Sequence, residues 1–360
     1  MATSHRILLT GANGYTAQHI LWELLEAGHS VRATARSQSK IDLIKKSFSK
    51  YANTPKLDFG VVPDITVPKA FDEVLKSTPP FDTVVHTASP FFLTSTDPTV
   101  YLEPAIKGTT EILENIVRVA PTVKRVVILS SFAAVATLHE NPISDPPKVY
   151  KRDDWLATTL EEAKLATNPV VSYPASKKLA EEAAWNFVKE GKGNFELVTL
   201  VPGVILGPVF DPKQIEDPET LNFSTWQIYN MLLKPGVKSS DPVPPTSIWQ
   251  YVDVRDLARA HLLAVTKPEA AGKRWITVGG EMSHQEWANY LREALPEKSD
   301  VIPIGEPANI AKPEGWFTYS APETVDVLGL TYRTRAETIK DLAPQLAEFA
   351  AKAAAAPAAA

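Results

Sequence analysis

The chain has 360 residues and a formal net charge of −5 at pH 7. This length exceeds the ~250–300 residues at which a single core tends to stop growing, so one large domain with a lobe, or two domains, is expected. Acidic and basic residues are interspersed, which leaves no basic footprint for nucleic acid. The sequence contains no cysteine, which excludes disulfides, thiolate catalysis and cysteine-ligated metals.

Targeting and metal signals are also missing from the sequence. No apolar run approaches the ~18 residues needed to span a bilayer, and residues 1–6 lack the basic and apolar regions of a secretory signal. We therefore expect a cytoplasmic protein that binds neither membranes nor nucleic acid. The histidines show no paired metal spacing, so we expect no metal site and interpret His86 and His261 as structural residues.

The N-terminal segment predicts a strand, a glycine loop and a helix. Residues 5–10 form a strand-like apolar run, and Gly11, Asn13, Gly14 and Tyr15 precede a stretch of helical periodicity. Glycines let the backbone pass close to a pyrophosphate, and the N-terminus of the following helix favours its charge. The pattern is G-x-x-G-x-x-A instead of the dinucleotide fingerprint G-x-G-x-x-G, so an ordinary strand-to-helix turn is the alternative.

The next strand-like run, residues 30–35, predicts which cofactor is bound. An NAD site usually has an acidic residue at this strand end to hold the ribose 2′-hydroxyl, and none is present. Arg36 and Lys40 follow instead, and such cations can bind a 2′-phosphate. The segment therefore favours NADP, with a solvated basic loop as the alternative.

Strand and helix patterns then alternate, as expected for a parallel, doubly wound sheet. Strands are expected at 57–61, 83–86, 125–129 and 197–201, and helices near 71–76, 101–119 and 173–189. The proline-rich stretch 138–169 is interpreted as a long surface connection. Capping boxes at Ser283–Glu286 and Ser320–Glu323 predict two late helix starts.

Tyr173 and Lys177 give the strongest indication of chemistry. They are four positions apart, so on a helix they share one face. A tyrosine hydroxyl has an ordinary pKa of about 10, and a nearby ammonium lowers that pKa by favouring the phenolate. Such a tyrosine can act as a general acid. A surface pair with the same spacing is the alternative reading.

Taken together, these motifs resemble the extended short-chain dehydrogenase/reductase family. The matching segments are 10–14, 35–38, 63–65, 86–90, 130–131, 173–177, 201–203 and 251–261. Within the family the sequence is most similar to the dihydroflavonol-reductase-like branch, and there to the yeast-type NADPH-dependent methylglyoxal and aldehyde reductases, which are carbonyl reductases. The resemblance extends to about Lys340.

The resemblance implies an α/β architecture with two parts and a tail. A Rossmann-type doubly wound parallel sheet over residues 1–202 binds NADP and carries the catalytic residues. A smaller, mixed C-terminal lobe over 203–345 binds substrate, and the chain crosses back to the sheet near 248–265. The Ala-rich tail, 350–360, is expected to be frayed.

The same resemblance implies roles for individual residues. Tyr173 donates the proton, Lys177 lowers its pKa and hydrogen-bonds the nicotinamide ribose, and Ser131 holds the substrate oxygen, with Ser130 as the alternative. Cofactor contacts are implied for Asp64 and Ile65 at the adenine, Thr87, Ala88 and Ser89 beside the nicotinamide, Pro202 and Val204 behind its ring, and Ser224 at a phosphate. Phe91, Phe132 and Trp226 are candidate substrate-binding residues. No asparagine matches the family's proton relay; Asn115 lies on the corresponding helix, outside any recognisable motif.

We therefore predict an NADPH-dependent reductase of aldehydes and ketones, acting as a monomer or homodimer on a small carbonyl substrate. One alternative is a nucleotide-sugar epimerase or dehydratase of the same superfamily, which usually retains NAD. Arg36 without a neighbouring acid counts against it. The other alternative is a non-catalytic, NADP-sensing protein on the same fold. The complete set Ser131, Tyr173 and Lys177 counts against that reading.

Overall fold

The computed structural model describes residues 4–89, 95–137 and 142–355. The chain divides into two compact units, each made of three separate segments. The first unit consists of Met1–Pro202, Leu257–Thr277 and Gly315–Leu330, and the second of Gly203–Asp256, Val278–Glu314 and Thr331–Ala360. The chain thus passes from one unit to the other at residues 202, 256, 277, 314 and 330.

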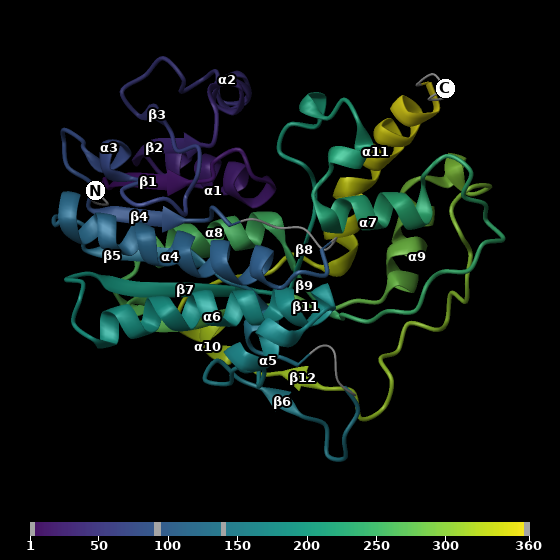
Figure 1. The fold of residues 1–360 in the computed structure, drawn as a ribbon. Helices are drawn as coiled ribbons and strands as arrows, with labels where there is room; N and C mark the ends of the chain where they lie inside the picture. The colour runs from purple at the N-terminus through teal and green to yellow at the C-terminus, as the bar shows by residue number, and fades with distance from the viewer. Residues whose placement is uncertain (1–3, 90–94, 138–141, 356–360) are drawn as a thin grey trace. The chain divides into compact units, whose positions relative to one another are not determined.

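The first unit is built around a seven-stranded, all-parallel sheet with the strand order β10-β7-β5-β4-β1-β2-β3 (Figure 1). The strands are β1 (Arg6–Thr10), β2 (Ser30–Ala35), β3 (Leu57–Val61), β4 (Thr83–His86), β5 (Arg125–Leu129), β7 (Glu196–Pro202) and β10 (Lys273–Thr277). β1 and β4 are buried throughout, as expected for central parallel strands covered on both faces. The predicted Rossmann-type fold is confirmed.

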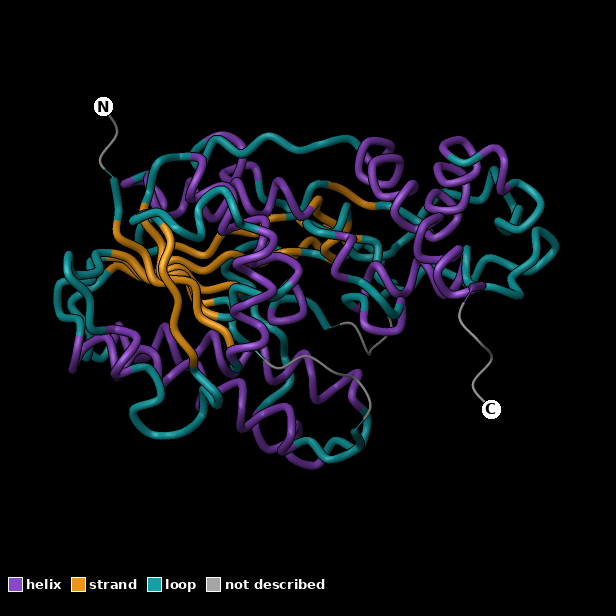
Figure 2. The backbone as a smooth tube through the Cα atoms, turned by 90° about the horizontal axis from the view of Figure 1, so that it is seen from above, coloured by secondary structure: helices purple, strands orange, loops and turns teal. Residues whose placement is uncertain are grey.

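Helices cover both faces of this sheet, and Figure 2 shows its strands between helical layers. On one face, α3 (Asp72–Leu75), α4 (Thr99–Val119) and α6 (Pro169–Lys189) share an apolar core with the strands. Gly108 of α4 leaves room for Ile65 there, because an added Cβ would lie 2.6 Å from the Ile65 Cδ1.

On the other face lie α1 (Tyr15–Glu26) and α8 (Val254–Thr266), joined by an ion pair between Glu23 and Arg259 at 3.5 Å. α2 (Gln38–Ser47) and α5 (Leu160–Leu165) complete the helices before α6.

The seventh strand, β10, was not among the predicted strands. Its residues Trp275, Ile276 and Thr277 are β-formers, and Gly272 precedes them, which was the available signal. We expected the chain to return to the sheet near 248–265. In the structure, Gln250–Asp253 forms a strand of another sheet, and the segment of the first unit begins at Leu257.

A two-stranded parallel pairing extends the first unit beyond the main sheet. It joins β6 (Val149–Tyr150) to β12 (Thr318–Tyr319), and α10 (Pro322–Asp326) follows. The predicted capping box at Ser320 is wrong: the Ser320 N–H continues the pairing by donating to the Tyr150 carbonyl at 2.8 Å, so the helix starts only at Pro322.

The second unit contains a small mixed sheet with the order β11-β9-β8. Its strands are β8 (Val204–Leu206), β9 (Gln250–Asp253) and β11 (Gly280–Glu281), and its helices are α7 (Phe223–Leu232), α9 (His284–Ala294) and α11 (Arg335–Ala355). β8 and β9 are parallel, whereas β9 and β11 are antiparallel. The capping box Ser283–Glu286 is confirmed at the start of α9.

Helix α11 corrects the expectation for the Ala-rich tail. It continues to Ala355, because Ala350 and Ala353 pack against the apolar core of the second unit. The tail is therefore helical through this residue, and 356–360 lie outside the described residues.

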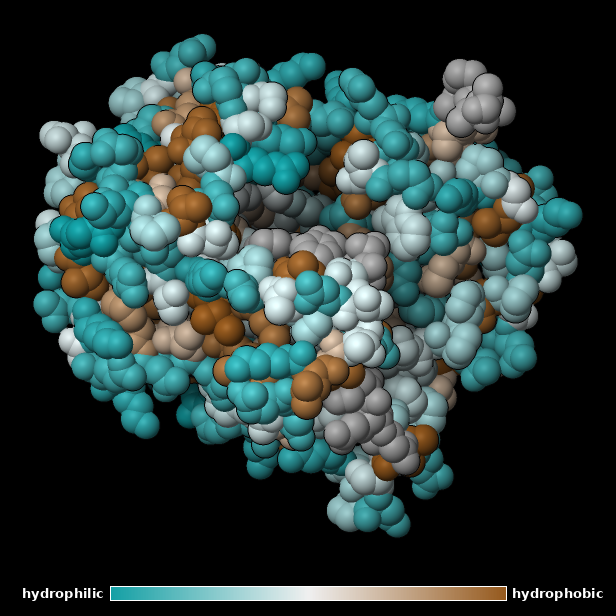
Figure 3. Space-filling model, in the orientation of Figure 1, coloured by the Kyte–Doolittle hydropathy of each residue, from teal (hydrophilic) through white to brown (hydrophobic). Residues whose placement is uncertain are grey.

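The surface shown in Figure 3 is mostly hydrophilic, with hydrophobic residues scattered among the polar ones. Among the described residues, no helix combines the length and the apolar character that crossing a membrane requires.

Candidate active site

Ser131 and Tyr173 meet at the carboxyl end of β5. Ser131 follows this strand and caps a short 3-10 turn, where its Oγ accepts a hydrogen bond from the Ala133 N–H at 3.2 Å. Tyr173 lies in the first turns of α6, which begins at Pro169 with Asn168 as its cap. The Ser131 hydroxyl interacts with the Tyr173 hydroxyl and acts to lower the Tyr173 pKa. Ser131 is thus both a local cap and a direct partner of the tyrosine.

Burial shifts the pKa values of both Tyr173 and Lys177. It raises the Tyr173 pKa to about 12, against the opposing effect of the Ser131 hydroxyl, and it lowers the Lys177 pKa to about 8. Loss of hydration sets the direction of the Tyr173 shift, and the role of Lys177 in lowering the Tyr173 pKa stays a prediction. The phenol remains protonated at neutral pH, which is the form that donates a proton.

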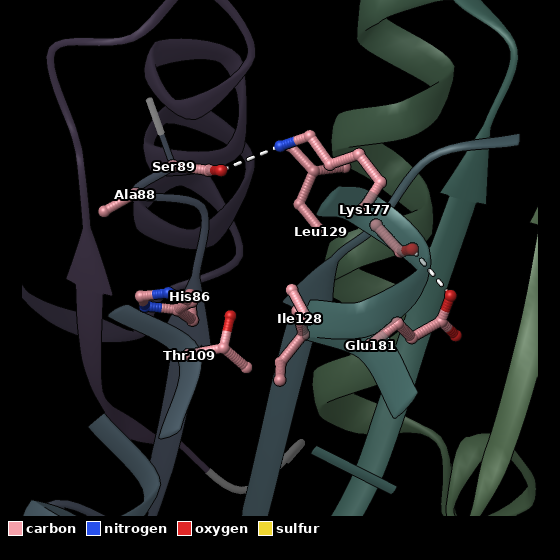
Figure 4. A pocket seen from close by; sticks show the side chains of 10 residues that line it. His86, Ala88, Ser89, Thr109, Ile128, Leu129, Lys177 and Glu181 are labelled. Atoms are coloured by element: carbon pink, nitrogen blue, oxygen red, sulfur yellow. Dashed lines mark hydrogen bonds between the residues drawn. The ribbon is translucent and has the colours of Figure 1, made fainter. Parts of the chain in front are cut away.

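Lys177 extends from α6 toward the end of β4 (Figure 4). Its Nζ donates a hydrogen bond to the Ser89 Oγ at 2.7 Å and lies 5.5 Å from the centre of the Tyr173 ring. Lys177 and Ser89 also line a pocket with His86, Ala88, Ser130 and Glu181. Groups from β4, β5 and α6 therefore converge at one edge of the sheet.

His86 is a neutral, structural member of this edge. Burial lowers its pKa to about 4, and the charge of Lys177 adds to this effect. Thr10 Oγ1 accepts from the N–H groups of Thr87 and Ala88 at 3.1 and 3.2 Å, so its proton points to His86 Nδ1, 2.9 Å away. This arrangement fixes the segment after β4 against the end of β1.

The glycine loop follows directly from β1. Gly11 has φ +67°, and a Cβ at this position would lie 2.9 Å from the Ala88 Cα, so only glycine fits between the two segments. Gly14 N–H donates to the Gly11 carbonyl at 2.9 Å and caps α1 without any side-chain hydrogen bond. A helix start of this kind suits the oxygens of a phosphate.

The basic residues after β2 are available to a ligand. Arg36 is exposed and Lys40 is partly exposed, and neither forms an ion pair with any residue that the structure describes. Arg32, four positions before Arg36, differs because its Nε donates to Asp58 at 2.6 Å.

The neighbouring Asp64 and Ile65 are held by local contacts. The Asp64 carboxylate accepts hydrogen bonds from Thr66, which lower its pKa, and Ile65 packs on Gly108 of α4.

The remaining loop residues have ordinary contacts. The Asn13 carbonyl accepts from Gln18 Nε2 at 3.2 Å, and the Tyr15 ring lies edge-on to His19. Pro202 ends β7.

Three predicted contact residues belong to the second unit. Val204 lies in β8, and Ser224 is buried, with its hydroxyl donating to the Ile205 carbonyl. Trp226 donates from Nε1 to Glu219 at 2.8 Å. The candidate Phe91 lies outside the described residues.

The ring of Phe132 is enclosed by aromatic residues of the first unit. It is 3% exposed and packs against Tyr150, Phe317 and Tyr319, with ring centres 6.2–6.5 Å apart. Its immediate role is thus to pack the segment after Ser131.

Asn115 has a structural role. It is fully buried, its Oδ1 accepts from the Phe71 N–H at 3.0 Å, and its Nδ2 donates to Glu111 at 2.6 Å. Both the acceptor and the donor of this amide are therefore bonded to residues other than Lys177.

Sequence reasoning missed two buried charges beside the site, Glu181 and Arg274. Glu181 lies one helical turn after Lys177, and Arg274 lies on β10, with 2.8 Å between the Glu181 Oε1 and the Arg274 Nε. The only signal for Glu181 was its spacing of four from Lys177 on a predicted helix. Arg274 gave none, because its strand was not predicted.

Comparisons with known proteins show which family the chain belongs to. The chain belongs to the NAD dependent epimerase/dehydratase family, whose model matches residues 7–279. It is 38% identical to the ketoreductase azaE of Aspergillus niger over 347 residues, which covers 96% of this chain and 98% of that protein. It is 35% identical to the NADPH-dependent methylglyoxal reductase GRE2 of Saccharomyces cerevisiae, covering 95% and 98%.

A solved structure gives the same result. The crystal structure of the yeast methylglyoxal/isovaleraldehyde reductase Gre2 complexed with NADPH matches with a TM-score of 0.87 at 34% identity. The match covers 96% of this chain and 99% of that chain. The predicted resemblance to the extended short-chain dehydrogenase/reductase family is confirmed.

Proposed function

We propose that the chain reduces aldehydes and ketones to alcohols with NADPH, and that Ser131, Tyr173 and Lys177 carry out the reaction. The observation that carries this proposal is the interaction of Ser131 with a Tyr173 phenol that stays protonated at neutral pH, with Lys177 beside it. The NADPH-dependent reductases among the relatives support the same cofactor and reaction class.

The residues proposed to hold the cofactor come from the carboxyl edge of the large sheet, except for Val204 and Ser224 of the second unit. Gly11, Asn13, Gly14 and Tyr15 would contact the pyrophosphate, Arg36 and Lys40 the 2′-phosphate, and Asp64 and Ile65 the adenine. Thr87, Ala88, Ser89, Lys177, Pro202 and Val204 would contact the nicotinamide half, and Ser224 a phosphate. NADPH, when bound, supplies the hydride that reduces the carbonyl carbon.

The protein's own residues handle the proton. The Ser131 hydroxyl would donate a hydrogen bond to the carbonyl oxygen and thereby hold it beside Tyr173. The Tyr173 phenol would give its proton to that oxygen as the alkoxide develops, which completes the alcohol. The Lys177 ammonium would stabilise the phenolate left behind, and solvent would return the proton to Tyr173.

The proposed substrates are small carbonyl compounds of the methylglyoxal, aldehyde or aryl-ketone type. Names of the relatives include a ketoreductase and a methylglyoxal/isovaleraldehyde reductase. Phe91, Phe132 and Trp226 stay candidate contacts for the substrate's apolar part. We also propose a cytoplasmic location and a monomeric or homodimeric state, which fluorescent tagging and light scattering respectively would test.

The test measures the loss of absorbance as NADPH, or separately NADH, is oxidised. The substrates are a panel of aldehydes and ketones and one nucleotide sugar. We expect NADPH oxidation with carbonyls, weaker turnover with NADH, and none with the nucleotide sugar. Tyr173→Phe should lower kcat on the order of 10³-fold, the scale of a lost general acid, while NADPH binding persists.

The matched control is Tyr51→Phe. It removes another buried tyrosine hydroxyl, which donates to Glu26 at 2.5 Å, and should leave kcat unchanged. Tight NADPH binding without turnover of any carbonyl, or turnover that survives Tyr173→Phe, would overturn the proposal.

A further inference from the structure

The buried carboxylate of Glu181 receives hydrogen bonds from four different side chains. Ser130 donates to its Oε2 at 2.7 Å, and Thr199, Trp185 and Arg274 donate to its Oε1 at 2.6, 3.2 and 2.8 Å. Glu181 is only 2% exposed, and Arg274 8%. A buried ion pair of this kind is costly and is often no better for stability than apolar residues. Stability alone therefore does not explain why this ion pair lies beside the site.

Ser130 links this carboxylate to the proton-donating pair. It immediately precedes Ser131, and its own N–H donates to the Leu200 carbonyl of β7 at 2.8 Å. Its hydroxyl donates to the Glu181 carboxylate at 2.7 Å, and Glu181 lies on α6 one turn beyond Lys177 (Figure 4). The end of β5 is therefore tied to the helix that carries Tyr173.

We propose that Glu181 is a positioning residue, which holds Ser131 beside Tyr173 through the bond that Ser130 donates to it. This proposal rests on the proposed function. The links form a closed circuit: Tyr173 to Ser131, Ser131 to Ser130 along the chain, Ser130 to Glu181, and Glu181 back to Tyr173 along α6. Breaking the Ser130–Glu181 bond frees the strand end to move against the helix.

Arg274 fixes the carboxylate itself. Its guanidinium stacks on Trp155, 3.6 Å from the ring centre, and its Nη1 donates to the carbonyls of Arg152 and Asp154 at 2.5 and 2.8 Å. These contacts hold the Arg274 guanidinium in place against Glu181, so the carboxylate can serve as a fixed reference for Ser130. Small displacements of catalytic groups have large effects on rate, which makes such a reference useful.

The chain offers a matched pair of variants for the test. Ser130→Ala and Thr199→Val each remove one hydroxyl donor to the same carboxylate, but only Ser130 is next to Ser131. Both should lower the midpoint of thermal unfolding by a similar small amount, on the order of 2 °C. A purely structural role of the cluster predicts equal effects on activity as well.

We expect Ser130→Ala to lower kcat about 10- to 100-fold with little change in NADPH affinity, whereas Thr199→Val stays within about twofold of the wild type. Ser130→Thr, which restores the hydroxyl, should recover most of the loss. Equal kcat values for the two hydroxyl deletions would overturn the proposal. If Ser130→Ala does not fold, Ser130→Cys, with similar volume and a weaker donor, replaces it in the comparison.

Crystal structures of the two variants without cofactor give a readout that does not depend on turnover. The distance between the Ser131 and Tyr173 hydroxyl oxygens should increase in Ser130→Ala and stay unchanged in Thr199→Val. An unchanged distance in both would overturn the positioning role. Absence of carbonyl turnover in the wild type would instead reject the proposed function, and the two crystal structures would still decide the geometry.

Discussion

Two polar regions at the same edge of the sheet differ in how their groups are satisfied. Glu181 and Arg274 are buried and bonded to each other and to several further partners. Arg36 and Lys40 are at least partly exposed, and form no ion pair with a described residue. A saturated cluster has nothing left to offer a ligand, whereas an exposed, unpaired cation after a glycine loop does. The number of hydrogen-bond and ion-pair partners therefore separates residues that stabilise the fold from residues that are available to a ligand.

The largest effect should come from removing a partner within the saturated cluster. Arg274→Met leaves the Glu181 charge buried without its cation, and should lower the free energy of unfolding by about 3–5 kcal/mol, measured by urea titration. Arg152→Met is the control, because its ion pairs with Asp153 and Glu323 lie at the surface at 3.6 and 3.9 Å, and should cost less than about 1 kcal/mol.

The double variant Glu181→Leu/Arg274→Met sharpens this result. Replacing both charges with apolar side chains should restore much of the lost stability. A double variant as unstable as Arg274→Met alone would mean that the unpaired charge is not the cause.

Arg36 should give the opposite combination, with an effect on cofactor choice and none on stability. Arg36→Met removes the proposed contact to the 2′-phosphate, so the preference for NADPH over NADH in kcat/KM should fall about 10- to 100-fold. The unfolding midpoint should not change. Lys46→Met removes a cation from the same helix region and serves as the control, since it should leave the preference intact. An equal loss in both variants would indicate only a general charge effect.

Lys177 should give the smallest effect, a dependence on pH. Its pKa of about 8 means that the ammonium is present below that pH and lost above it. If the ammonium stabilises the phenolate, kcat should fall about tenfold per pH unit above pH 8.

Two neighbouring variants separate this titration from other alkaline effects. Lys177→Arg, whose guanidinium does not titrate there, should remove the decline at whatever activity remains. Lys178→Arg is the control, because Lys178 donates to the Thr158 carbonyl at 2.9 Å and should keep the wild-type profile. A decline that persists in Lys177→Arg would assign it to another group.

The sequence predicted the elements whose local signals agreed with their surroundings. The six strands of the large sheet from β1 to β7 lie where the sequence predicted them, and the Ser283–Glu286 capping box starts α9 as expected. Ser320 failed as a cap because its backbone pairs with Tyr150, a partner far away in the sequence.

The site was predictable only in part. The spacing of Tyr173 and Lys177 could be read directly, whereas the direction of the Tyr173 pKa shift depends on burial, which spacing does not reveal. Glu181 required knowledge of β10, since its cation comes from that strand. Contacts between residues far apart in the sequence therefore determine the features that local sequence patterns do not predict.

The way the chain alternates between the two units has a practical consequence for exchanging parts among relatives. A fragment that ends at Pro202 lacks β10, so Glu181 loses Arg274, and β7 becomes an unpaired edge that can recruit other chains. The second unit therefore cannot be replaced as a single cassette. A chimaera that exchanges the second unit with that of a relative has to be joined at residues 202, 256, 277, 314 and 330, which keeps the large sheet intact.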